Sequence, residues 1–96
     1  MSTPPKLHQL RAERDQLRAA VRDADMRLQE LAQAIETLEA RNEALAADGF
    51  SLPWAESQRL AELVDERGAC TQQTEGLRDR LRPLAQIVAR CEEALR

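Results

Sequence analysis

Large aliphatic residues recur about every 3.5 positions along most of the 96-residue sequence, and no other feature restricts the fold as strongly. When Leu7 is placed at heptad position a, nine of the twelve a and d positions between residues 7 and 45 are large aliphatics. Such a sustained repeat predicts an α-helical coiled coil. Thr3 is a good N-cap and Pro4 suits the first helical position, so the first helix is expected to span about residues 4–47.

The segment after this helix reads Asp-Gly-Phe at residues 48–50 and predicts a helix stop. Gly49 is expected in the left-handed conformation, with Phe50 folding back on Leu45. A new helix is expected to follow at once, because Ser51 can cap it and Pro53 fits its first turn. The predicted turn therefore covers residues 48–52.

The second half of the sequence repeats the heptad pattern from Leu60 onward. The phase of the pattern is kept across Gly68, Gly76 and Pro83, which predicts one helix over about residues 53–95, kinked near Pro83. The glycines weaken this helix, so a break within residues 68–76 and a three-helix bundle remain an alternative.

Two helices of similar length joined by a short turn pack antiparallel. The predicted fold class is therefore all-α, an antiparallel two-helix coiled-coil hairpin that forms a single domain over residues 1–96. In the expected register Ile35 faces Leu63 and Leu38 faces Leu60, while a slip by one heptad is the alternative.

A two-helix hairpin has a small core for its surface. This sequence has more apolar residues than the seam, the a and d positions between the two helices, needs. The additional apolar residues flank the seam at Ala32, Ala34, Val64 and Ile87. They predict a homodimer that completes a four-helix bundle.

Charge is unevenly distributed although the net charge is only −3. Residues 23–66 hold three basic and eleven acidic groups, whereas the remaining residues hold eleven basic and six acidic ones. The functional hypothesis for the basic end is a docking site for an acidic protein, a phosphate backbone or an anionic surface. The simpler interpretations are a solvated surface, or pairing with the acidic end of a second subunit. The candidate docking residues are Arg11, Arg18, Arg22, Arg78, Arg80 and Arg82.

The predicted turn contains the only Phe and the only Trp of the chain. Phe50, Leu52 and Trp54 form a candidate partner-binding tip, because Trp residues are common anchors of protein interfaces. The structural interpretation is that Phe50 closes the first helix and Trp54 covers the last core layer.

Several classes of function find no support in the sequence. Apolar runs are too short for a membrane span or a secretion signal, which favours a cytoplasmic location. Cys70 and Cys91 are about 31 Å apart on one helix and are expected to be free thiols, and His8 has no ligand set around it. No catalytic or cofactor-binding motif is present, so we expect neither an enzyme nor a cofactor or metal site. The 13 arginines against one lysine are typical of a GC-rich bacterial or phage gene.

These observations predict a protein–protein interaction module, such as an adaptor, assembly factor, small chaperone, inhibitor or other regulator, that acts by helix-face docking. The alternative is a nucleic-acid accessory protein that grips phosphates with its arginine-rich end.

Overall fold

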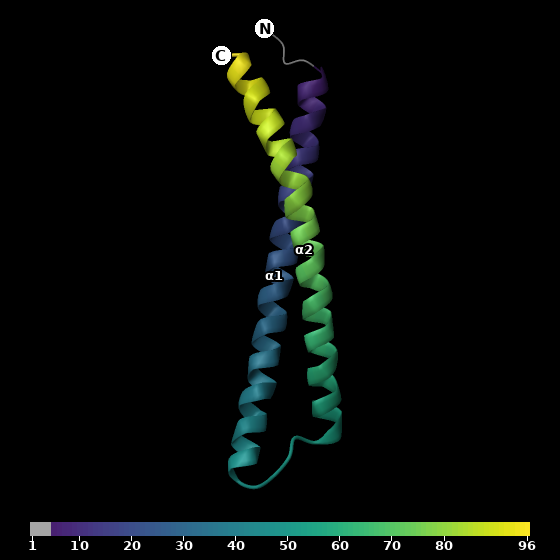
Figure 1. Ribbon diagram of the computed structural model, residues 1–96, viewed down its shortest axis with the longest axis vertical. Helices are drawn as coiled ribbons and strands as arrows, with labels where there is room; N and C mark the ends of the chain where they lie inside the picture. Colours follow the sequence, from purple (N-terminus) through teal and green to yellow (C-terminus); the bar gives the residue numbers. More distant parts are fainter. Residues whose placement is uncertain (1–4) are drawn as a thin grey trace. The chain divides into compact units, whose positions relative to one another are not determined.

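The computed structural model describes residues 5–96 and consists of two long helices (Figure 1). Helix α1 spans Pro5–Ala47, helix α2 spans Trp54–Ala94, and residues 48–53 connect them. The helices run in opposite directions and pack against each other as a helical hairpin, with no strand among the described residues. The predicted all-α hairpin is confirmed. The predicted cap at Thr3 and Pro4 lies outside the described residues.

Helix α1 ends in a Schellman motif, as the Asp-Gly-Phe segment predicts. Gly49 has a φ of 82°, which is the left-handed conformation. Its N–H donates to the Ala46 carbonyl at 3.0 Å, and the N–H of Phe50 donates to the Leu45 carbonyl at 2.8 Å. These two bonds satisfy carbonyls that the helix leaves open at its end, and they fix the direction of the chain as it leaves α1.

Helix α2 begins at Trp54, within one residue of the predicted start. The N–H of Ser57 donates to the carbonyl of Pro53 at 2.9 Å, so Pro53 precedes the first helical residue, Trp54. The prediction that Ser51 caps this helix is wrong, because Ser51 lies two residues before the position that accepts the first helical bond.

Helix α2 then continues without interruption to Ala94. It contains Gly68, Gly76 and Pro83, so the three-helix alternative is not observed. Because the apolar phase is kept through this stretch, seam packing on both sides favours a single helix over a break. The kink near Pro83 remains a prediction.

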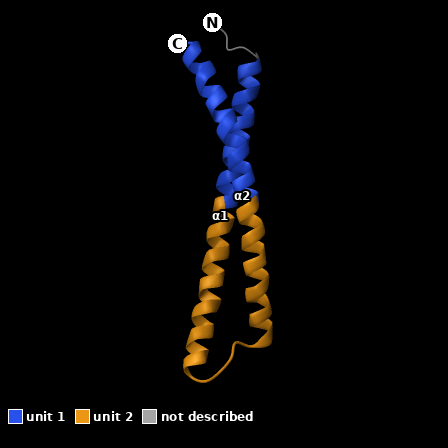
Figure 2. Cartoon of the chain, viewed as in Figure 1, with its two compact units in different colours: residues 1–24, 73–96 blue, residues 25–72 orange. Residues whose placement is uncertain are grey.

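The chain divides into two compact units, each made from one part of both helices (Figure 2). Unit 1 comprises residues 1–24 and 73–96, of which 5–24 and 73–96 are described, and unit 2 comprises residues 25–72.

Unit 2 contains a continuous apolar core. Its buried members are Leu31, Ile35, Leu63 and Cys70, and Leu28, Ala34, Leu38 and Leu60 pack against them. Seven of these eight residues occupy the predicted a and d positions, and the cluster brings together both predicted pairs of the expected register. Full burial of each large aliphatic side chain is worth about 1.5–3 kcal/mol.

An ion pair in unit 2 supports the expected register. Arg41 of α1 pairs with Glu56 of α2. The expected register places Ser57, next to Glu56, opposite Arg41, whereas a slip by one heptad would place Val64 there.

Unit 1 is held by fewer large buried side chains. Among its described residues Leu7, Ala24, Thr74 and Val88 are buried, and only two of these are large aliphatics. The hydroxyl of Thr74 is not left without a partner.

Candidate interaction surfaces

Both aromatic side chains of the chain are exposed where the helices connect, Phe50 in the connection and Trp54 at the start of α2. Phe50 is 66% exposed and Trp54 is 77% exposed, while Leu52 beside them is half-buried. We call these three residues the aromatic tip. The prediction that Trp54 covers the last core layer is wrong, since a side chain so exposed covers no core. The backbone of Phe50 does close α1, as predicted, but its ring remains in solvent.

The aromatic tip belongs to a strongly acidic unit. Unit 2 contains ten acidic and four basic residues. Arg41 pairs with Glu56, and Nη2 of Arg27 donates to Oε2 of Glu66 at 2.8 Å. Two of the four cations are thereby engaged across the helices, and the field around the tip is negative.

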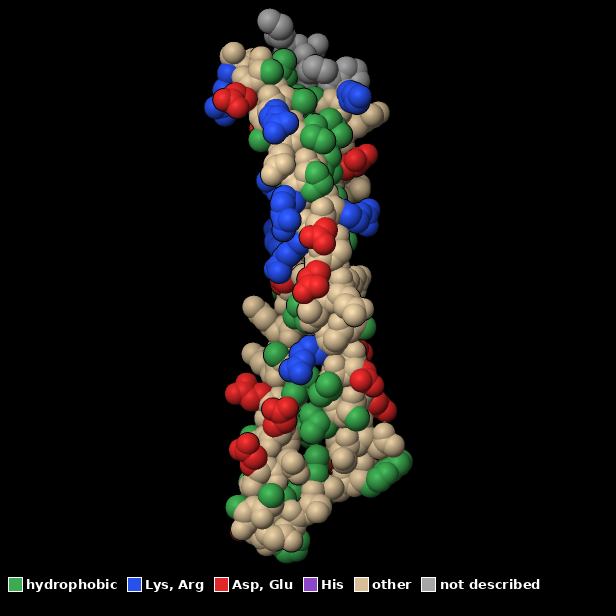
Figure 3. Space-filling model, viewed as in Figure 1, with side chains coloured by type: hydrophobic (Ala, Val, Ile, Leu, Met, Phe, Trp, Pro, Cys, Tyr) green, Lys and Arg blue, Asp and Glu red, His purple; other side chains and the backbone are tan. Residues whose placement is uncertain are grey.

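Unit 1 has the opposite charge, with ten basic and seven acidic residues in its segments. On the face shown in Figure 3, the blue side chains of Lys and Arg gather over unit 1. The predicted arginines of unit 1 are not equivalent, however, because some are already bound to carboxylates.

Arg11 is occupied by an acidic residue of the opposite helix. Its Nε donates to Glu92 Oε1 at 2.9 Å, and an Arg14 nitrogen donates to the same oxygen at 3.4 Å. The hydrogen bond from Arg11 holds the pKa of Glu92 below its usual value, with the charges of both arginines acting in the same direction. Arg11 therefore pairs within the hairpin, and its predicted docking role stays a prediction.

Arg14 lies on the predicted seam and is tied to carboxylates. Only 17% of its side chain is exposed, and besides Glu92 it contacts Asp15 at 3.2 Å. Glu92 is not among the residues predicted from the sequence to form a site. Its position three residues before Leu95, one of the a positions, places it beside the seam and could have pointed to it.

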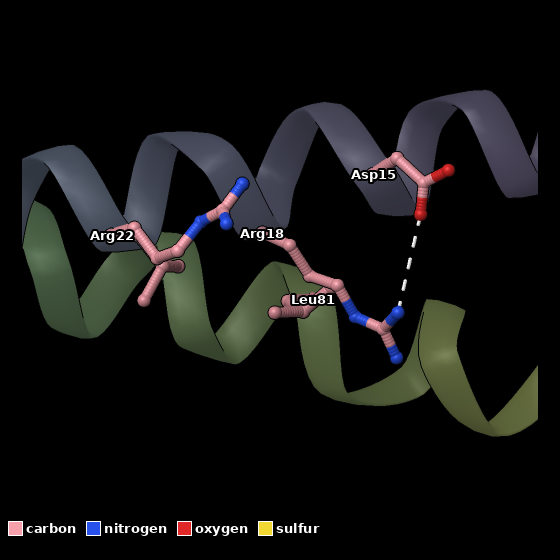
Figure 4. Close-up of a pocket in the computed structure, with 5 residues that line it drawn as sticks. Asp15, Arg18, Arg22 and Leu81 are labelled. Carbon is pink, nitrogen blue, oxygen red and sulfur yellow. Dashed lines mark ion pairs between the residues drawn. The ribbon is translucent and has the colours of Figure 1, made fainter.

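Two other predicted arginines line a groove in unit 1 (Figure 4). The groove has a volume of about 490 Å³ and is lined by Asp15, Arg18, Val21, Arg22 and Leu81. Figure 4 shows Arg18 extending from α1 toward α2 beside Leu81. Arg18 reaches Asp15 only at 4.0 Å, and among residues 5–96 no carboxylate lies within 4.0 Å of Arg22. We call this site the arginine groove.

The remaining predicted arginines lie on α2, outside the lining of this groove. Arg78 has an interaction partner in the structure. Arg82 contacts Asp79 at 4.0 Å, and Arg80 is exposed without a carboxylate within 4.0 Å in the described part of the chain. The structure thus brings Arg18 and Arg22 into one site and leaves the other arginines outside it.

The residues predicted to flank the seam differ in accessibility. Ala32 is exposed, Val64 is 39% exposed and Ile87 is 46% exposed, but Ala34 is half-buried and packs against the core of unit 2. Ala34 is therefore part of the hairpin interior, and the other three residues are available to a partner.

A second groove in unit 1 is mainly apolar. It has a volume of about 430 Å³ and is lined by Lys6, Leu7, Leu10, Ile87, Cys91, Ala94 and Leu95. Cys91 is half-buried in this groove and Cys70 is buried in unit 2, and both are free thiols as predicted.

Neither the structure nor comparison with known proteins adds a recognised site. No helix in the described residues is both long and apolar enough to cross a membrane. Within the same residues no group of three or more His, Cys, Asp or Glu side chains is arranged to hold a metal ion. No protein family, curated protein or solved structure matches the chain.

Proposed function

We propose that the chain is a protein–protein interaction module and that its aromatic tip is the main contact with a partner. The observation that supports this proposal is the exposure of Phe50 and Trp54, the only aromatic side chains in the chain, at the turn end of the hairpin. Exposed aromatic side chains only four residues apart suit an interface, because aromatic side chains are enriched where proteins bind one another.

The helix ends support the tip as a preorganised anchor. Phe50 follows directly on the Schellman motif of α1, and Trp54 is the first residue of α2. Their backbones are fixed before binding, so a partner does not have to order a flexible loop. The acidic character of unit 2 favours a partner with an apolar pocket and a basic rim.

Helix faces provide additional contact area in this proposal. Val64 and Ile87 are apolar and exposed, and they suit docking of a partner helix. An adaptor, an assembly factor, a small chaperone or an inhibitor would each use such surfaces. Two free thiols suit a reducing compartment such as the cytoplasm, and the arginine bias suits a bacterial or phage source.

The observations favour a protein partner over a nucleic acid. Binding of a single strand uses aromatic stacking beside basic side chains. Here the aromatic rings are in unit 2, whereas the arginine groove is in unit 1, and Arg11 is engaged by Glu92.

Photo-crosslinking at the tip tests the proposal. A photoreactive phenylalanine analogue replaces Trp54, and the matched control carries it at Met26, which is also exposed and also in unit 2. In lysate of the native host, we expect position 54 to give a discrete cross-linked protein that position 26 does not give. Unlabelled wild-type protein should compete for this product, and the Phe50→Ala/Trp54→Ala variant should not. If the variant competes as well as wild type, the tip is not the contact.

A further inference from the structure

The arginine groove combines guanidinium groups that have no close carboxylate with an apolar floor. Arg22 has no carboxylate within 4.0 Å among the described residues, and Arg18 has only a distant one. Val21 and Leu81 line the same groove and are half-buried. Such a site fits a surface that offers carboxylates next to small apolar side chains, because it can pair the charges and cover the floor at the same time.

Unit 2 offers a surface with this chemistry. Glu36, Glu39 and Glu43 follow one another at helical spacings of three and four on α1, so they share one edge of the helix. All three are exposed, and none has a basic group within 4.0 Å in the part of the chain that the structure describes. Ala32, also exposed, is four residues before Glu36 and lies on the same edge. We call Ala32, Glu36, Glu39 and Glu43 the acidic edge.

We propose that the arginine groove of one copy of this chain binds the acidic edge of a second copy. With the two α1 helices antiparallel, Arg22 pairs with Glu36 and Arg18 with Glu39, while Ala32 supplies a small apolar surface. Each copy carries both surfaces, so the contact is reciprocal and closes a two-fold dimer in which every pair forms twice. The inference is independent of the aromatic tip and concerns a different surface.

Charge balance gives the second copy an advantage over a phosphate ligand. Unit 1 has a net charge of +3 and unit 2 has a net charge of −6, so contact between unit 1 of one copy and unit 2 of another joins opposite charges. The dimer predicted from the flanking apolar residues thereby acquires a defined polar contact.

A charge-swap experiment tests this dimer by sedimentation equilibrium. Wild-type protein is expected to dimerise at micromolar concentration. Arg18→Glu/Arg22→Glu should weaken dimerisation by roughly 10- to 100-fold, since attraction becomes repulsion at both symmetric contacts. Glu36→Arg/Glu39→Arg should do the same. An equimolar mixture of the two variants should regain the dimer, because each face of the mixed dimer again joins opposite charges.

The matched control is Arg80→Glu/Arg90→Glu, which makes the same change of net charge in unit 1 at exposed positions outside the groove. This control should dimerise like wild type. Circular dichroism checks that each variant is helical, and Arg18→Gln/Arg22→Gln replaces the reversal if the reversed chain is not. Because the tip is intact in all variants, loss of the dimer with unchanged cross-linking at position 54 separates this inference from the proposed function.

Three results would overturn the inference. The first is a wild-type monomer at concentrations up to about 100 μM, where even weak dimers are populated. The second is a mixture of variants that stays monomeric. The third is a monomer that binds a labelled DNA duplex or RNA strand through Arg18 and Arg22, with affinity falling steeply as salt rises. That result would assign the groove to nucleic acid.

Discussion

Units 1 and 2 use the same two helices but join them with different interactions. Unit 2 packs large aliphatic side chains such as Leu31, Ile35 and Leu63 into one core. Unit 1 has two small or polar residues among its buried positions, Ala24 and Thr74, and adds the Arg11–Glu92 ion pair. Burial of apolar surface contributes more than a half-exposed ion pair, so unit 2 is expected to be the more stable part of the hairpin.

The backbone sharpens this contrast. Unit 1 contains Pro83, which removes one helical hydrogen bond, and Gly76, which is flexible in the unfolded chain. Unit 2 contains Gly68, within the helix, and Gly49, whose positive φ fits its turn. The two units therefore differ in packing and in helix propensity, and the two effects can be separated by mutation.

The largest expected effect is loss of the unit 2 core. Leu31→Ala removes a side chain that is almost fully buried and should lower the free energy of unfolding by about 2–5 kcal/mol. Leu81→Ala in unit 1 is the matched change at a half-buried position, and it should cost only about 1–2 kcal/mol. Urea unfolding followed by circular dichroism measures both. Equal losses would contradict the assigned difference in packing.

Replacement of Pro83 should have the next largest effect and the opposite sign. Pro83 is exposed, so Pro83→Ala removes little packing, and it supplies an N–H for the carbonyl of Asp79. We expect an increase of about 1–3 kcal/mol in the free energy of unfolding. Hydrogen exchange measured by mass spectrometry should show the added protection mainly in unit 1. Protection that rises equally in unit 2 would mean that the units do not open separately.

Glycine replacements should give smaller effects that depend on backbone conformation. A Cβ at Gly68 or Gly76 meets no atom within 4 Å, so each change to alanine should stabilise the chain by about 1 kcal/mol. Gly49→Ala also has open space, but its φ of 82° makes alanine cost about 1–2 kcal/mol. Thermal unfolding of the three variants should therefore show two increases and one decrease in Tm. A stabilised Gly49→Ala variant would contradict the left-handed turn.

Periodicity made the seam predictable. Large aliphatic side chains at a and d positions lie on one face of each helix, so residues such as Ile35 and Leu63 are predicted to lie between the two helices. The helix stop at Gly49 was equally clear, because few other residues adopt positive φ without strain. These are local or repeating properties, which a sequence shows directly.

The candidate surfaces were less predictable because they depend on the reach of single side chains. The sequence left two places open for Trp54, a lid on the last core layer or an exposed tip, and the structure leaves it 77% exposed. Arg11 and Arg18 have the same heptad position, but only Arg11 has Glu92 opposite it. Such differences arise from the pairing of two distant segments, which heptad counting does not resolve.

The smallest expected effect concerns Glu92 and the pH dependence of unit 1. The hydrogen bond from Arg11 lowers the pKa of Glu92 in the folded chain, so the folded state binds this proton less readily than the unfolded state. The resulting stabilisation is fully present above the unfolded pKa of about 4.3 and is lost as the pH falls through the lower folded value. Glu92→Gln removes the titrating group. The stability difference between wild type and this variant should therefore be constant from pH 7 to about pH 5 and shrink at lower pH.

Urea unfolding at several pH values measures this difference, and hydrogen exchange should place its effect in unit 1. Glu75→Gln is the matched control, since Glu75 is exposed in unit 1 and has no basic group within 4.0 Å among the described residues. The difference in free energy of unfolding between wild type and Glu75→Gln should change less at low pH than the difference between wild type and Glu92→Gln. If the free energy of unfolding of Glu92→Gln parallels that of wild type throughout the pH range, the Arg11–Glu92 ion pair does not stabilise unit 1. The two units would then differ only in their apolar packing.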